Sequence, residues 1–334
     1  MKILNQQIFE NKEAAALPGL MESGGLPALV SGLSGIHRVN LAAALYERLE
    51  LPMFVVCPDD SSAESFSRDL EAMLGRPVNT LYSRDFTFYP SLAASREAEQ
   101  KRLYVLNALR CGESPVTVAT VSALMQRAIP PQTLGKAAFT VKDGEPCPPE
   151  ELEAALLRCG YTRCEQVEGA GQFARRGGII DFFSPAYPEP VRIEFWGDDI
   201  DSMGFFNIKT QRRTESVEIC RILPAAESLM TLASGGTESL TDALRAAADK
   251  CAKHKSSQQL RQLEQNLRAD IERLEQNVKI EYADRYMPFL YEKASGADYI
   301  PEEAVVFLDQ PPRCADRAKG FAKQLGDDLS ELVK

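Results

Sequence analysis

The sequence predicts an α/β fold, in which a parallel-sheet domain is interrupted by a smaller α+β domain. Three observations support this class. Short apolar segments alternate with amphipathic ones from about Leu26 to Gln126, strand-like alternation then fills about Ala137–Leu223, and an apolar segment, Ala304–Asp309, returns near the end. Continuous apolar strands separated by helices are typical of a parallel sheet covered on both faces. We expect the late segment to rejoin that sheet, which makes the middle domain an insertion.

The first part of the chain, residues 1–127, is predicted to form the first segment of the sheet domain. Strands are predicted at Ala28–Ser31, Met53–Val56, Val78–Leu81 and Val116–Thr120. Helices are predicted at Asn40–Leu49, Ser62–Leu74 and Glu97–Leu109. The strand segments are short and rich in apolar residues, whereas the helical segments repeat apolar residues at spacings of three and four.

The middle part, residues 137–224, is predicted to be the inserted α+β domain. A helix at Pro149–Cys159 is followed by alternating segments such as "VRIEFW" and "IDSMGFFN", which indicate an antiparallel sheet. Residues 225–334 are expected to hold a helical segment and the returning strand that completes the first domain. Apolar residues from Leu260 to Val278 recur at spacings of three and four, which predicts a helix with one apolar stripe.

Composition excludes several classes of protein. The 334 residues, 44% of them hydrophobic, suffice for two domains or more. A net charge of −10 argues against a general nucleic-acid binder, although a local basic face could still make a DNA clamp. Eight cysteines without a C-x-x-C pair and two histidines, His37 and His254, predict no metal site. Reduced thiols, the lack of a signal peptide and the lack of a transmembrane run favour a cytoplasmic location.

The segment "GLSGIHRV", residues 32–39, has the frame of a phosphate-binding loop without its working residues. The pattern G-x-x-x-x-G-K-[ST] needs a glycine for the tight turn, a lysine for the phosphates and a hydroxyl for magnesium. The residues of this degenerate loop are Gly32, Gly35, His37, Arg38 and Val39. His37 is bulky where the turn needs glycine, and Val39 cannot bind a metal. Arg38 keeps the positive charge of the lysine, but its guanidinium is a planar fork and not a compact ammonium group. The alternative is an ordinary strand-to-helix turn.

The returning strand supports the loss of nucleotide chemistry. In folds of this kind a later strand ends in Asp-Glu, where the aspartate holds magnesium and the glutamate orients the attacking water. Here the strand ends in Asp309–Gln310, and glutamine is no base. Asp309 is alternatively a simple turn residue. Because both halves of the site are altered, we predict no catalytic residue, no metal and no cofactor in this chain.

From Gly171 to Ala225 the sequence resembles a segment shared by UvrB and the bacterial transcription-repair coupling factors (Mfd). The pattern G-x-[FY]-x-x-R-G-[GA]-[IL]-[IL]-D appears as "GQFARRGGIID", and P-x-R-[IL]-[ED]-[FL]-F-x-D-[ED]-I-[ED]-S appears as "PVRIEFWGDDIDS". Mild departures occur at Phe182, Trp196 and Arg213. The segments "REAEQKRLYVLNAL" and "ADRYMPFLY" are also similar to coupling factors, so that the resemblance covers nearly the whole chain.

The resemblance implies a UvrB-like fold without ATPase activity. UvrB has an intact phosphate loop, whereas the N-terminal module of the coupling factor has a degenerate one, and "GLSGIHRV" matches the latter. The stretch Tyr82–Arg96 is also too short for the hairpin that UvrB inserts into damaged DNA. The implied function is recruitment of UvrA in transcription-coupled nucleotide excision repair. A UvrB-type ATPase or helicase subunit of the excision nuclease is the alternative.

The family resemblance further implies a longer protein. Its RNA-polymerase-binding domain and its motor, which uses ATP and magnesium to translocate on double-stranded DNA and displace stalled RNA polymerase, would follow Lys334.

The UvrA-docking surface is predicted in the middle domain. Strand alternation places Arg192 and Trp196 on one face of "PVRIEFW", opposite the apolar residues, and Trp and Arg are enriched at binding hot spots. The family pattern adds Arg176, which precedes Gly177–Gly178, so the predicted UvrA-binding residues are Arg176, Arg192 and Trp196.

Two structural alternatives to this docking surface stay open. Another layer could cover Trp196, or Arg192 could simply pair with an acid on a neighbouring strand. Asp181 is interpreted as an ordinary turn or strand-end acid without a chemical role. Arg212 and Arg213 are interpreted as residues of a solvated turn.

Overall fold

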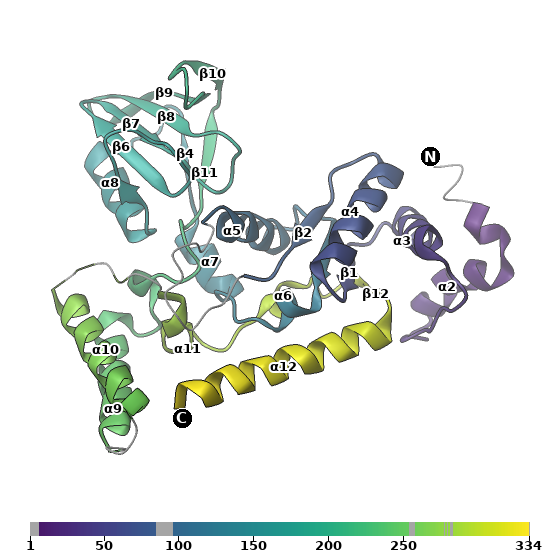
Figure 1. Ribbon diagram of the computed structural model, residues 1–334. Coiled ribbons are helices and arrows are strands. Elements are labelled where there is room, and N and C mark those ends of the chain that lie inside the picture. The colour runs from purple at the N-terminus through teal and green to yellow at the C-terminus, as the bar shows by residue number, and fades with distance from the viewer. Residues whose placement is uncertain are drawn as a thin grey trace. The chain divides into compact units, whose positions relative to one another are not determined.

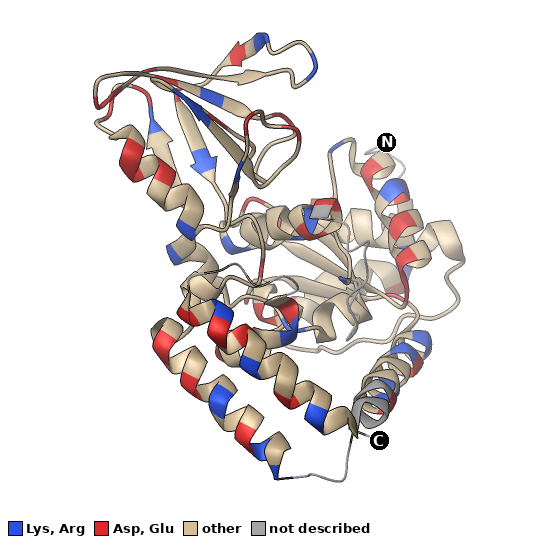
Figure 2. Ribbon diagram, turned by 60° about the vertical axis from the view of Figure 1, so that its left-hand side comes forward, with Lys and Arg blue, Asp and Glu red and all other residues tan. Residues whose placement is uncertain are grey.

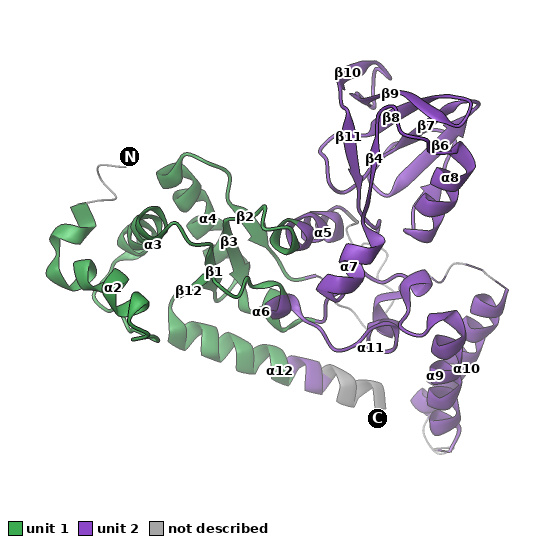
Figure 3. Ribbon diagram, turned by 180° about the vertical axis from the view of Figure 1, so that it is seen from behind, with its two compact units in different colours: residues 1–83, 108–126, 299–323 green, residues 84–107, 127–298, 324–334 purple. Residues whose placement is uncertain are grey.

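The computed structural model describes residues 7–84, 96–253, 258–276, 278, 280 and 283–333. Tertiary contacts divide the chain into two compact units. Residues 1–83, 108–126 and 299–323 form unit 1, and residues 84–107, 127–298 and 324–334 form unit 2 (Figure 3). The predicted domain boundaries at residues 127, 137 and 224 stay predictions. Among the described helices, none combines the length and the apolar character that a membrane crossing requires.

Unit 1 is built on a four-stranded parallel sheet with the strand order β12-β1-β3-β2 (Figure 1). Its strands are β1 (Met53–Cys57), β2 (Asn79–Leu81), β3 (Val116–Thr120) and β12 (Val305–Leu308). Met53 lies opposite Val116 on one side and Val305 on the other. The late apolar segment therefore rejoins the first sheet, as predicted. Strands β1 and β3 are buried along their whole length, which is the environment that continuous apolar strands require.

Amphipathic helices supply the rest of the unit 1 core. The helices are η1 (Ile8–Glu10), α2 (Lys12–Glu22), α3 (Gly35–Leu49), α4 (Asp60–Leu74) and α6 (Val121–Met125), and α12 (Pro311–Val333) begins in this unit. Helix α4 begins where the side chain of Asp59 accepts a hydrogen bond from the backbone N–H of Ser62, and it ends at Gly75, whose φ is 65°. Its buried residues Phe66 and Leu70 pack in the same core cluster as Val55 and Val118.

The predicted strand Ala28–Ser31 does not form. This segment lies outside every strand, and the side chain of Leu29 is 84% exposed. Strand β1 is paired on both sides, by β12 and by β3, so this segment could have joined the sheet only at an outer edge. A short apolar run does not identify a strand on its own, and Pro27 just before it cannot donate a ladder hydrogen bond. The strand that should precede the phosphate-loop frame is therefore missing from this sheet.

Unit 2 contains a six-stranded sheet with the order β10-β9-β8-β7-β6-β5, and a separate two-stranded sheet of β11 and β4 (Figure 1). The strands are β4 (Phe139–Lys142), β5 (Thr162–Arg163), β6 (Gln172–Arg176), β7 (Ile179–Phe182), β8 (Val191–Trp196), β9 (Asp199–Phe206), β10 (Arg213–Ser216) and β11 (Ile219–Ile222). The predicted antiparallel pairing holds from β6 to β10, whereas β5 pairs parallel to β6. Helix α8 (Pro149–Arg158) buries Leu152 and Leu156 in the same core cluster as Phe173 and Ile193.

The remaining elements of unit 2 are mostly helical. They are α5 (Arg96–Arg110, in this unit up to residue 107), α7 (Pro131–Ala137), η2 (Met230–Leu232), α9 (Gly236–Ala252), α10 (Gln258–Glu275), η3 (Ala283–Tyr286), α11 (Met287–Leu290) and η4 (Gly296–Tyr299, in this unit up to residue 298). Helices α9 and α10 lie side by side (Figure 1), and α10 buries the predicted stripe residues Leu267, Ile271 and Leu274. Charged residues of both signs are interspersed along the helices (Figure 2).

A buried charged cluster holds the chain segment that follows β11. Glu227 is fully buried, and its Oε1 accepts a hydrogen bond from Nε of Arg102 at 2.8 Å. Arg84 lies 3.6 Å from the same carboxylate oxygen. The backbone N–H of Glu227 donates to Oε1 of Glu99 at 2.8 Å. Helix α5, which carries Glu99 and Arg102, thereby fixes this segment within unit 2.

Candidate functional site

Strand β8 presents an apolar face to the core and a polar face away from it. Val191 and Ile193 are fully buried and Phe195 packs against the same cluster, whereas Trp196 is 82% exposed. The predicted strand parity is therefore confirmed. Of the two alternatives, a layer covering Trp196 is wrong. An indole that is exposed to this degree contributes little to the core and is available to a partner.

Arg192 lies on the same face as Trp196 but is largely buried. Its Nε donates to Oδ1 of Asp181 at 2.7 Å and its Nη2 donates to Oδ2 at 2.9 Å, a bidentate pair across β7 and β8. The Arg192 guanidinium also stands 4.6 Å from the ring centre of Phe206, and 17% of the arginine side chain is exposed. The hydrogen bonds to Asp181 raise the pKa of Arg192 above the ordinary value of arginine. The second alternative, pairing with an acid on a neighbouring strand, is thus what the structure contains.

Asp181 binds a second arginine as well. Nη2 of Arg176 donates to Oδ2 of Asp181 at 2.8 Å, and the Arg176 side chain is 51% exposed. Asp181 itself is 1% exposed and lies directly opposite Ala174 on β6 and Arg192 on β8. The interpretation of Asp181 as a turn or strand-end acid is wrong, because a buried carboxylate inside a strand needs cationic partners.

The turn between β6 and β7 brings Arg176 near the end of β8. Gly177 has a φ of 60°, which favours glycine, and the carbonyl of Gly178 accepts a hydrogen bond from the N–H of Phe195 at 2.8 Å. A Cβ atom on Gly178 would lie 3.2 Å from the carbonyl oxygen of Phe195. The paired glycines therefore allow the turn to pack on the strand that ends in Trp196.

A second turn, between β9 and β10, closes over Arg192. Gln211 has the unusual φ of 59°, and its carbonyl oxygen and its Oε1 each lie 3.3 Å from a terminal nitrogen of Arg192. A positive φ at a residue other than glycine is uncommon and is maintained by surrounding contacts. Arg212 and Arg213 are exposed, but the prediction of a turn is wrong for Arg213, which begins β10 and donates to Oγ of Ser202 at 3.1 Å. The turn thus adds two contacts that order the Arg192 guanidinium, beside those of Asp181.

The degenerate nucleotide loop is a turn that leads into α3. Gly32 has a φ of 82°, and α3 begins at Gly35. Oγ of Ser34 lies 2.9 Å from Nδ1 of His37, so that the histidine ring stands next to the first turn of the helix. In a working loop this helix end would receive phosphate oxygens. Here the side chains of Ser34 and His37 contact each other instead, and neither caps a backbone N–H of the helix.

The other degenerate positions also have partners within unit 1. Nη1 of Arg38 lies 2.5 Å from Oδ1 of Asp309, which is 2% exposed. Gln310 has a φ of 51°. Its Nε2 donates a hydrogen bond to Oδ2 of Asp309 at 3.3 Å. Val39 is buried in the core. The predicted residues of the two half-sites, Arg38 and Asp309, therefore do meet, as an ion pair.

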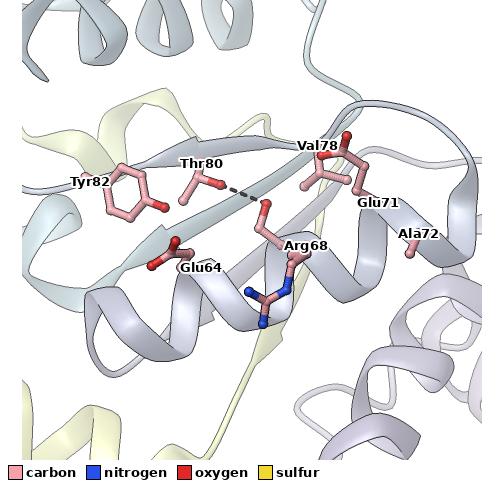
Figure 4. A pocket seen from close by; sticks show the side chains of 8 residues that line it. Glu64, Arg68, Glu71, Ala72, Val78, Thr80 and Tyr82 are labelled. Atoms are coloured by element: carbon pink, nitrogen blue, oxygen red, sulfur yellow. Dashed lines mark hydrogen bonds between the residues drawn. The ribbon is translucent and has the colours of Figure 1, made fainter. Parts of the chain in front are cut away.

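Other candidate chemistry is sparse in the described residues. A groove of about 480 Å³ between α4 and the edge strand β2 is lined by Glu64, Arg68, Glu71, Thr80 and Tyr82 among others, and a 2.8 Å hydrogen bond joins Thr80 to Ser67 (Figure 4). Its charged side chains make no acid–base or metal-binding arrangement.

No cluster of three potential metal ligands occurs where the structure describes the chain. All eight cysteines are free thiols. His254 and most of Tyr82–Arg96 lie outside the described residues.

The part of unit 2 that holds this site matches a known family of domains. Residues 139–227 match the family of UvrB interaction domains, and this match spans Arg176, Asp181, Arg192 and Trp196. Most of the chain is moreover similar to proteins named transcription-repair-coupling factor. It is 29% identical to that of Bacillus subtilis over 98% of the chain, 28% to that of Myxococcus xanthus over 84%, and 30% to that of Escherichia coli over 61%.

These comparisons confirm the family resemblance and are consistent with the expected N-terminal module of a coupling factor. The chain spans 28%, 24% and 18% of the length of these three relatives.

Proposed function

We propose that this chain is the UvrA-docking module of a transcription-repair coupling factor and acts in transcription-coupled nucleotide excision repair. One observation carries the docking role. An 82% exposed tryptophan and a half-exposed arginine, Arg176, stand on one face of the domain that matches the UvrB interaction family. Aromatic and arginine side chains of this kind are typical anchors of protein interfaces.

The whole protein would act as an ATP-driven translocase on double-stranded DNA that displaces stalled RNA polymerase. This part of the proposal is supported by the names of the relatives, which are several times longer than the chain. ATP and magnesium would then act in the motor of the longer protein, in the cytoplasm. The chain itself would be non-enzymatic.

The lack of nucleotide binding is proposed from the geometry of unit 1. The arginine in the lysine position is engaged by Asp309, and the glycine of the loop is replaced by His37, whose ring contacts Ser34. A titration with a fluorescent ATP analogue and magnesium is expected to show no saturable binding at millimolar nucleotide. Saturable binding that disappears in Arg38→Ala would contradict this part of the proposal.

The UvrB-type ATPase is not favoured as an alternative. It would need the lysine and the hydroxyl of the loop and a glutamate after Asp309, whereas the chain has Arg38, Val39 and Gln310. A DNA-contacting clamp finds no support in a chain with a net charge of −10 and interspersed charges (Figure 2).

The docking role is tested with purified UvrA and the 334-residue chain by calorimetry. Trp196→Ala and Arg176→Ala are each expected to weaken binding by about 2–4 kcal/mol, roughly 30- to 1,000-fold, as central anchors do. Arg175→Ala is the matched control, because Arg175 faces α8 and pairs with Glu150 and Glu153. Wild-type affinity in both Trp196→Ala and Arg176→Ala would place the docking face elsewhere.

A further inference from the structure

Asp181 stands at the centre of the polar face that carries Trp196. Its two carboxylate oxygens accept three hydrogen bonds within 2.9 Å, two from Arg192 and one from Arg176. The carboxylate lies under these side chains and is 1% exposed, so a partner protein cannot reach it directly. Any influence of Asp181 on docking must therefore pass through the arginines that it holds.

The two arginines differ in what they leave for a partner. Arg192 is enclosed by Asp181, by the ring of Phe206 and by the Gln211 turn, and 17% of it is exposed. Arg176 is bound to Asp181 through one terminal nitrogen, and half of its side chain faces solvent. Arg192 thus neutralises and fixes the carboxylate, while Arg176 presents a guanidinium outward from it.

We propose that Asp181 is a positioning residue, which fixes Arg176 on the face that carries Trp196 for an acidic group on the partner. Because Arg176 is hydrogen-bonded to Asp181, its side chain has lost much of its rotamer freedom before binding. The planar guanidinium is also suited to bind a carboxylate. Fixing one such side chain in advance is worth about a tenfold gain in affinity. The proposal rests on the proposed docking function and adds to it the residue that organises the surface.

A double-mutant cycle on the full chain tests this positioning. UvrA affinity is measured for the wild type, Arg176→Gln, Asp181→Asn and the double variant. We expect Arg176→Gln to weaken binding about 30-fold and Asp181→Asn about tenfold, and the double variant to match Arg176→Gln within about threefold. Arg175→Gln should bind as the wild type does. If the two losses multiply instead, Asp181 does not act through Arg176 and the proposal is overturned.

The folding of each variant is controlled separately. Each variant is checked by its melting curve, and if Asp181→Asn does not fold, the same cycle is run with Asp181→Glu, which keeps the charge but moves the carboxylate.

A readout without UvrA is the NMR rotation rate of the Arg176 guanidinium, expected to be slow in the wild type and fast in the Asp181 variant. Equal rates would overturn the positioning role. Slow rotation in a wild-type chain that does not bind UvrA would refute the proposed function alone.

Discussion

At the residue scale, Arg192 is placed on an outer face of the sheet and is nevertheless largely buried. Strand parity determines only which way a side chain leaves the strand. What covers it depends on neighbouring strands and turns, here Asp181 on β7 and the Gln211 turn. Arg192 and Trp196 therefore share a face but differ in exposure, since Arg192 is hydrogen-bonded to neighbouring segments and Trp196 faces solvent. The predicted part of Arg192 in UvrA binding stays a prediction.

This difference predicts effects of unequal size on stability. Arg192→Ala removes two of the three hydrogen bonds of the buried Asp181, so it should lower the free energy of unfolding by about 1–3 kcal/mol. Trp196→Ala should change it by no more than about 0.5 kcal/mol, since the indole is exposed. Urea unfolding measures both. Equal small effects would show that Asp181 needs only Arg176.

At the element scale, α3 and β12 are joined by the ion pair of Arg38 and Asp309. Asp309 is 2% exposed, and a buried carboxylate without a cation is costly. Arg38→Ala is expected to lower the free energy of unfolding by about 2–4 kcal/mol. Replacing both residues, as Arg38→Met with Asp309→Leu, should recover most of this loss. A double variant that is no more stable than Arg38→Ala would speak against an uncompensated charge as the cause.

Strand β10 depends on a glycine in the neighbouring strand β9. A Cβ atom on Gly204 would lie 2.6 Å from the carbonyl oxygen of Glu215, so backbone has to move. We expect Gly204→Ala to loosen β10 from β9, visible as faster amide hydrogen exchange from Arg213 to Ser216. Gly169→Ala is the control, since its Cβ would meet nothing within 4 Å. Unchanged exchange in β10 would mean that the strands adapt without separating.

At the scale of the whole molecule, a titrating acid adjoins the buried charged cluster of unit 2. Burial and the nearby Asp284 raise the pKa of Glu99 to about 7, above its ordinary value of 4.5. The folded chain therefore holds this proton more tightly than the unfolded chain. The contribution of the protonated Glu99 to the free energy of unfolding is complete below about pH 4.5 and is lost as the pH rises through 7.

The variant Glu99→Gln removes this titration while its amide oxygen can still accept the hydrogen bond from Glu227. At pH 8 the variant is expected to be more stable than the wild type by about 1–2 kcal/mol, and the difference should shrink towards pH 5. Thermal unfolding across this range measures it. A constant difference at every pH would contradict the raised pKa.

The sequence predicted the strands that are buried on both faces, because β1 and β3 need continuous apolar residues. It also predicted β12, although the pairing partners are far apart in the chain. The strand at Ala28–Ser31 was wrong because a short apolar run does not by itself distinguish a strand from an irregular segment. Asp181 was missed because its partners come from other strands, and residue spacing along the chain cannot show them.

The pairing of β1 with β12 has a consequence for the order of folding. Residues 53 and 305 are in register, so most of the chain, including the whole segment that matches the UvrB interaction family, lies between the two paired strands. On a ribosome β12, the partner of β1, emerges after the other three strands of this sheet. Contacts this distant are slow to form, since the loop entropy is lost before they contribute. We therefore expect the domain between them to acquire its native hydrogen bonds first, and β12 to dock as a late, separate step.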